Sequence, residues 1–255
     1  MTPKSSIWLK CLLVLGLASM LTGLTWAQEE TTKADQSDIE KHIDASARVL
    51  EEIMKVPDKA IPDNVMKNAK CIAVVPSMVK IAVGVGGNHG RGVATCRTEN
   101  GWSAPAPITI TGGSWGLQLG GQAIDLVTVV NNQSGMDHLL SSKFKLGADA
   151  SAAAGPVGRD AGADTDLKMK AEVLTYSRAR GLFAGIDLNG AAITQDKDET
   201  RVLYGRFESF EDIRKSKVEP TASSRRFLAA VRRYSEEVHE RTSQNESNTG
   251  SSASK

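Results

Sequence analysis

The segment that most constrains this fold is residues 143–159, KFKLGADASAAAGPVGR, which has alanine and glycine where a core normally needs bulk. Alanines fill little space, so their backbone must lie close to another backbone or to a flat surface. Gly155 and Pro156 then mark a sharp turn. The segment is therefore either a tightly packed strand followed by a structural turn, or a shallow surface for a head group. The basic residues bordering such a surface are Lys143, Lys145 and Arg159.

Residues 1–27 have the features of a cleaved signal peptide. Lys4 and Lys10 precede an apolar run from Cys11 to Leu24, which is the usual length of a signal-peptide core and short for a membrane-spanning helix. We expect cleavage after Ala27 and a periplasmic or secreted protein, with an uncleaved anchor as the alternative. Beyond the signal peptide, we expect a flexible linker at 28–36, one domain at 37–241 and a disordered tail at 242–255.

The charge of the mature chain argues against nucleic acid as a partner. Removing Lys4 and Lys10 from the 31 basic residues leaves 29, against 30 acidic residues. Nucleic-acid-binding domains usually carry a basic excess. We therefore expect no nucleic-acid binding.

Two cysteines remain in the mature chain, Cys71 and Cys96, and both lie in apolar runs that resemble strands. An oxidising compartment favours a disulfide between an even pair. Two buried free thiols are the alternative, because the sequence does not show whether the two residues have the geometry that a disulfide needs.

Hydrophobic periodicity predicts helices at both ends and strands between them. One helix begins near Ser37 and ends at Pro57, a short one follows Pro62, and one or two helical turns cover residues 136–141. The predicted strands include residues 71–76, 92–97, 108–111, 126–130, 144–151, 168–177, 182–188, 191–194 and 201–204, and the apolar character of 71–76 continues through 79–85. The pairs Asn100-Gly101 and Asn189-Gly190 predict hairpin turns. The fold class is α+β, a single domain with a bent antiparallel sheet or partial barrel flanked by N- and C-terminal helices.

The C-terminal helix combines an apolar stripe with a cluster of arginines. The stripe contains Phe227, Val231, Tyr234 and Val238. The arginines beside it are Arg225, Arg226, Arg232 and Arg233. Such a helix can lie on an anionic membrane surface, or the stripe can pack on the sheet and leave the arginines solvated.

The motifs that suggest catalysis do not have the context that catalysis needs. GGSWG at 112–116 matches a nucleophile elbow, but LQLGGQ follows where the elbow requires a helix, so we predict that Ser114 is not a nucleophile. GVGGNHGRG at 84–92 fits neither a dinucleotide loop nor a P-loop. Its glycines indicate a bend between strands, or a loop whose amides grip an anion together with Arg91.

Metal ligands are not indicated either. Asp160, Asp164 and Asp166 have the wrong spacing for an EF-hand calcium loop. The histidines have no metal-ligand spacing and lie at His42, His89, His138 and His239. We expect no catalytic residue, no metal and no cofactor.

A series of short motifs over about residues 38–206 has an order more specific than any single motif. The series is Pro57-Asp58, Ile61-Pro62, Val75-Pro76, Gly84-Val85-Gly86-Gly87, Gly90-Arg91-Gly92, Trp102-Ser103-Ala104-Pro105, Gly116 to Gly120, Leu146 to Asp149, Gly155 to Arg159, Tyr176-Ser177-Arg178, Gly181 to Gly185 and Tyr204-Gly205. It resembles the SYLF family of lipid-binding domains, most closely the exported bacterial members with paired cysteines.

The resemblance implies a non-enzymatic domain. Eukaryotic members of the family bind phosphoinositides with help from an N-terminal amphipathic segment, and some engage actin. For an exported protein, we expect binding of anionic lipid or phospholipid head groups at the periplasmic membrane surface. The alternative is a structural or interaction module of the envelope that binds a protein partner through its β surface.

Overall fold

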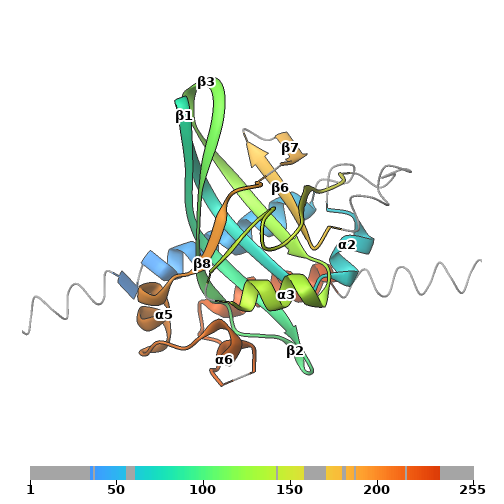
Figure 1. Cartoon of the computed structure of the whole chain (residues 1–255). Coiled ribbons are helices and arrows are strands. Elements are labelled where there is room, and N and C mark those ends of the chain that lie inside the picture. The colour runs from blue at the N-terminus through green and yellow to red at the C-terminus, as the bar shows by residue number, and fades with distance from the viewer. Residues whose placement is uncertain are drawn as a thin grey trace, which may run out of the picture.

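Two very long strands organise the molecule, β1 (Cys71–Thr98) and β3 (Ala106–Val130), which pair antiparallel along almost their whole length (Figure 1). The computed structural model describes residues 35–36, 38–55, 61–141, 143–157, 171–179, 182–186, 188–215 and 217–235. The other strands are β2 (Gly101–Trp102), β4 (Lys143–Lys145), β5 (Ala152–Ala154), β6 (Val173–Ala179), β7 (Leu182–Gly185) and β8 (Ala192–Gln195). The helices are 38–54, α2 (Asp63–Asn68), α3 (Gln133–Leu140), α5 (Lys197–Tyr204), α6 (Phe210–Arg214) and 224–235.

The sheet curls back on itself into a half-barrel. Cys71 and Cys96 lie 25 positions apart in β1, a separation that spans about 80 Å in a straight strand. Their Cα atoms are 4.0 Å apart and their sulfurs form a disulfide. Gly92 permits the close crossing, because an added Cβ would lie 2.0 Å from the carbonyl oxygen of Val74. The predicted disulfide and the predicted α+β fold with a bent antiparallel sheet are both confirmed.

The sequence predicted separate strands at residues 71–76 and 92–97 with a glycine-rich bend between them, whereas the structure has one continuous strand. The glycine-rich segment stays within β1, where residues 85–88 pair with residues 112–115 of β3. Register shifts between Val75 and Met78 and between Val83 and Val85 mark bulges. Bulges and glycines let a strand bend strongly while its hydrogen-bonded ladder continues.

A second correction concerns residues 201–204, predicted as a strand and found in α5. The Asp196 side chain accepts hydrogen bonds from the backbone N–H groups of Asp198 and Glu199, which starts the helix. Gly205, with φ of 73°, ends it in the left-handed conformation. The predicted strand at 144–151 is also shorter, since β4 ends at Lys145.

Alternating side chains divide the curled sheet into two faces. Ile72, Val74 and Val93 point to a face that helices 38–54 and 224–235 cover, which we call the covered face. Cys71 and Ala73 point to the opposite face, which we call the inner face, and pack in a second cluster with residues from α3, β4, β8 and α6. Both faces of the sheet are therefore buried near the start of β1. Helices cover one face, and short strands and helices cover the other.

The alanine-rich segment confirms the packed-strand interpretation at residues 152–155. Ala152–Ala154 form β5, which pairs parallel to β6. At Gly155 an added Cβ would lie 2.1 Å from Cζ of Tyr176. The flat surface against which Gly155 lies is therefore the buried ring of Tyr176.

Several sequence predictions fall outside the described residues. These are the signal peptide at 1–27, most of the linker at 28–36, the tail at 242–255, Arg159, and the three aspartates Asp160, Asp164 and Asp166.

Candidate functional site: a basic strand face

The strand register brings distant basic residues onto one exposed face of the half-barrel. Lys143 of β4 pairs with Thr194 of β8, Thr194 pairs with Thr109 of β3, and Thr109 pairs with Arg91 of β1. Residues paired across strands point to the same side of a sheet, so Arg91 and Lys143 share a face. They stand about 14 Å apart, three strand spacings.

A second row lies beside the first on the same face. Lys145 pairs with Ala192, Ala192 with Thr111, and Thr111 with His89. The four basic side chains are exposed, and we call this surface the basic strand face: His89, Arg91, Lys143 and Lys145, with threonines Thr109, Thr111 and Thr194 between them. Hydroxyl donors and cations on one flat surface suit an oxyanion such as a phosphate.

The opposite side of the same four strands is apolar and buried. Ile108, Ile110, Phe144 and Ile193 alternate with the residues of the basic strand face and belong to the inner cluster. A one-residue slip would bury the lysines, so this packing fixes the register and holds the basic side chains outward.

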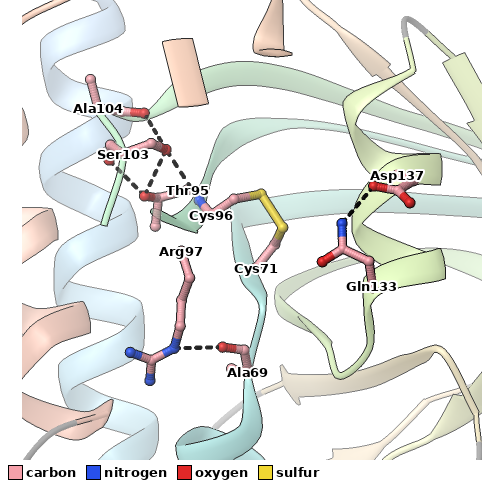
Figure 2. Close-up of a disulfide and its surroundings, with 9 residues drawn as sticks. All are labelled: Ala69, Cys71, Thr95, Cys96, Arg97, Ser103, Ala104, Gln133 and Asp137. Atoms are coloured by element: carbon pink, nitrogen blue, oxygen red, sulfur yellow. Dashed lines mark hydrogen bonds between the residues drawn. A yellow bond between two sulfur atoms is a disulfide. The ribbon is translucent and has the colours of Figure 1, made fainter. Parts of the chain in front are cut away.

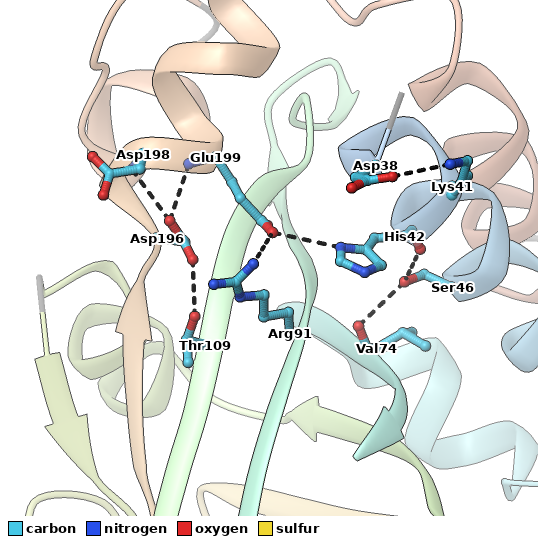
Figure 3. Close-up of polar contacts among 10 residues, drawn as sticks. All are labelled: Asp38, Lys41, His42, Ser46, Val74, Arg91, Thr109, Asp196, Asp198 and Glu199. Atoms are coloured by element: carbon cyan, nitrogen blue, oxygen red, sulfur yellow. Dashed lines mark hydrogen bonds and ion pairs between the residues drawn. The ribbon is translucent and has the colours of Figure 1, made fainter. Parts of the chain in front are cut away.

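Carboxylates border the face and bind specific donors. Thr109 donates a hydrogen bond of 3.0 Å to Asp196, which also caps α5 (Figure 3). Asp149 accepts a 2.7 Å hydrogen bond from the backbone N–H of Lys145. Glu199, whose side chain is 14% exposed, lies with its Oε1 atom 3.5 Å from Nη1 of Arg91.

His42, on helix 38–54, completes this border. Its Nδ1 atom lies 3.5 Å from the same Oε1 atom of Glu199, as Figure 3 shows. The interaction with Glu199 raises the pKa of His42 above its ordinary value and outweighs the lowering by burial and by Arg91. Sequence reasoning found Arg91 and the two lysines but missed the role of His42, His89 and Glu199, because only the strand pairing places them together.

The arginines of the C-terminal helix do not flank an exposed apolar stripe. Phe227 and Val231 are fully buried in the covered cluster, and Tyr234 packs against it. Arg226 forms ion pairs with Asp44 at 2.7 Å and Glu51 at 3.4 Å on helix 38–54. Arg225, Arg232 and Arg233 are exposed. Of the two interpretations of this helix, packing of the stripe within the domain is therefore the one observed.

Helix 38–54 likewise buries its apolar face. Ile39, Ile43 and Leu50 are at most 1% exposed and lie in the covered cluster. In this conformation the helix has no apolar stripe to offer a membrane, unlike the amphipathic segment implied by the family resemblance.

The disulfide joins Cys71, the first residue of β1, to Cys96 near the end of the same strand. Beside it, Ser103 Oγ accepts from the backbone N–H of Cys96, and Thr95 donates to the Ser103 carbonyl at 2.7 Å (Figure 2). Arg97 Nε donates to the carbonyl of Ala69 at 2.9 Å. The disulfide and the Arg97 hydrogen bond tie the end of β1 to the start of the same strand, so Cys71 and Cys96 are structural residues.

Other kinds of site have little support among the described residues. Ser114 lies within β3, which continues to Val130 without the helix that a nucleophile elbow needs. Within the described ranges no group of three or more His, Cys, Asp and Glu side chains could hold a metal ion. None of the helices that the structure describes is long and apolar enough to cross a membrane.

The fold defines a class, a domain built on a curled antiparallel pair of long strands that presents a basic surface. Residues 111–234 match the family model Ysc84, described as "Las17-binding protein actin regulator". The chain therefore contains a domain of the Ysc84 family, also called SYLF, which is a family of binding proteins and not of enzymes.

Named relatives agree with this assignment. "SH3 domain-containing YSC84-like protein 1" of Xenopus laevis is 34% identical over 176 residues, and that of Homo sapiens is 32% identical over 175. Each match covers 66% of this chain and 51% of the relative. "LAS seventeen-binding protein 3" of Saccharomyces cerevisiae is 34% identical over 152 residues, which are 58% of this chain and 33% of that protein. The chain thus spans about half the length, or less, of the curated relatives it matches.

Proposed function

We propose that this protein binds anionic phospholipid head groups through the basic strand face, at the periplasmic side of a membrane. The observation that carries the proposal is the register that aligns Arg91 with Lys143 and His89 with Lys145. Two rows of cations with threonines between them face solvent over four strands. Each cation close to an anionic surface contributes about 1 kcal/mol to binding, so a few suffice for salt-sensitive attachment.

The periplasmic location rests on the sequence of residues 1–27 and on the disulfide. Cys71 and Cys96 are fully buried and bonded, and such bonds persist in oxidising compartments. Phosphatidylglycerol is a suitable probe because it carries one phosphodiester charge and no other ionisable group.

The test is sedimentation of the mature protein, residues 28–255, with vesicles of phosphatidylcholine alone or mixed with phosphatidylglycerol. We expect binding to the anionic vesicles only, and release as salt rises. The double variant Lys143→Glu/Lys145→Glu should weaken binding by at least about tenfold. Both lysines are exposed, and circular dichroism checks that the variant is folded.

A matched control reverses two exposed charges elsewhere, Arg225→Glu/Arg232→Glu on helix 224–235. This control changes the net charge equally and should bind nearly as the parent does. If the control loses binding and the lysine variant keeps it, the C-terminal helix is the contact and the basic strand face is not. If the parent binds neither vesicle, the lipid proposal is wrong.

A second candidate is binding of a protein partner through the β surface. The relatives' names support it, since one is named for binding LAS seventeen. An exposed aliphatic pair in β1 also supports it, Val79 at 44% and Ile81 at 56% exposure. A photocrosslinker placed at Ile81→Cys, with one at Thr98→Cys as control, should then yield a specific adduct without lipid. Equal labelling from both positions counts against this candidate.

A further inference from the structure

One carboxylate at the edge of the basic strand face lies between two basic side chains from different elements. Oε1 of Glu199 is 3.5 Å from Nη1 of Arg91 and 3.5 Å from Nδ1 of His42 (Figure 3). Glu199 belongs to α5, Arg91 to β1 and His42 to helix 38–54. The hydrogen bonds of Asp196 to Thr109 and to the first N–H groups of α5 hold Glu199 in this position.

We propose that Glu199 is an internal competitor for the anionic ligand of the basic strand face, and that protonation of His42 relieves this competition. The inference rests on the function proposed above and adds a pH dependence to the same site. With His42 neutral, Glu199 neutralises Arg91, and the three side chains together carry no net charge. With His42 charged, two cations share one carboxylate, so the cluster gains one positive charge and Arg91 is released toward the ligand.

The charged groups around His42 determine the direction of the effect. Glu199 faces it from α5, Arg91 from β1, and Asp38 from its own helix. The interaction with Glu199 is the main cause that raises the pKa of His42, and burial and Arg91 oppose it. Because the pKa is raised, His42 gains its proton at a higher pH than a free histidine. Binding of an anion should therefore strengthen as pH falls through that pKa.

A second histidine, His89, lies on the basic strand face. It is exposed there, so His89→Gln serves as a background in which the effect of His42 is measured alone. Each added cation should strengthen vesicle binding by about fivefold. In this background the protein should gain one such factor between about pH 8 and pH 5, as His42 becomes charged, and His42→Gln should lose it.

The experiment measures sedimentation of the mature protein with phosphatidylglycerol vesicles over this pH range. Glu199→Gln should bind about fivefold more tightly than the parent at the alkaline end, because Arg91 no longer has a charged competitor. His42→Lys, which is permanently charged, should likewise bind more tightly there. His138→Gln is the control, since His138 lies on α3 beside Glu172, and it should keep the parent's profile.

The outcomes separate this inference from the proposed function. If His42→Gln keeps the parent's full pH dependence, or if Glu199→Gln binds no better than the parent at alkaline pH, the inference is refuted while lipid binding stands. If no protein binds at any pH, lipid binding itself is refuted and the inference falls with it. Thermal unfolding of each variant confirms that folded proteins are compared.

Discussion

Gly155 should not tolerate even a methyl group, because the backbone lies directly on the ring of Tyr176. An added Cβ would lie 2.1 Å from Cζ, 2.4 Å from Cε1 and 2.6 Å from Cε2 of that ring. Ordinary contact begins at 3.4 Å, so the strand or the ring must move by more than 1 Å. Tyr176 is fully buried and the ring has little room to move.

The expected cost follows from two opposing effects. Overpacking of a filled core typically costs about 1–3 kcal/mol, and this contact lies at the upper end of that range. Alanine also restricts the unfolded chain, which offsets roughly 0.5–1 kcal/mol. We therefore expect Gly155→Ala to lower the free energy of unfolding by about 2 kcal/mol, measured by urea unfolding of the oxidised protein followed by circular dichroism.

Two further variants test the cause. Gly121→Ala is the matched control, because an added Cβ there meets nothing within 4 Å, and its stability should stay within about 0.5 kcal/mol of the parent. In a Tyr176→Leu background the ring is gone, so Gly155→Ala should cost much less than in the parent. An equal cost in both backgrounds would falsify the contact with the ring as its origin.

Three more changes should affect stability in stated directions, all measured by urea unfolding. Replacing Cys71 and Cys96 by alanine should cost about 3.5 kcal/mol or more, since the bond closes a loop of about 26 residues and both sites are buried; a loss below 1 kcal/mol would contradict this. Ser77 has φ of 49°, so Ser77→Val should cost about 1–2 kcal/mol while Ser77→Gly should not destabilise. Arg178→Met leaves the half-buried Asp125 without its 2.6 Å ion pair and should cost about 2 kcal/mol. Arg201→Met removes an exposed ion pair and should cost less.

Local signals in the sequence predicted local structure well. The predicted hairpin turn at Asn100-Gly101 joins β1 to β2, with φ of 118° at Gly101. A turn is also present at Asn189-Gly190, with φ of 87° at Gly190, but it is not the predicted hairpin, because β7 pairs with β6 and β8 pairs with β3 and β4. The α-helical stripe from Ile39 to Met54 forms the expected helix. These features depend on residues a few positions apart, and their physical causes are contained in the short segment itself.

Long-range pairing could not be read from the sequence. Nothing near Lys143 indicates that it joins Arg91 through β8 and β3, because the register is set by the burial of residues such as Phe144 and Ile193 against the rest of the inner cluster. For the same reason the sequence could not place Glu199 beside Arg91. The arginines of the C-terminal helix are close together in the sequence, so the cluster could be recognised there. The burial of Phe227 could not, because it depends on a partner helix far away in the chain.

The basic strand face and the covered face lie on the same side of the sheet, and only the covered face is buried under the terminal helices. Along β3 the residues on this side change from Thr109 and Thr111 at the start to Val127 and Val129 at the end. The terminal helices bury the valine end, where apolar contact stabilises them. Extending that cover over the threonine end would bury Arg91 and two lysines, and each unpaired buried charge costs several kcal/mol. The chain's own apolar helix faces are therefore unsuited to this surface, whereas an anionic surface can cover it without leaving the charges unpaired.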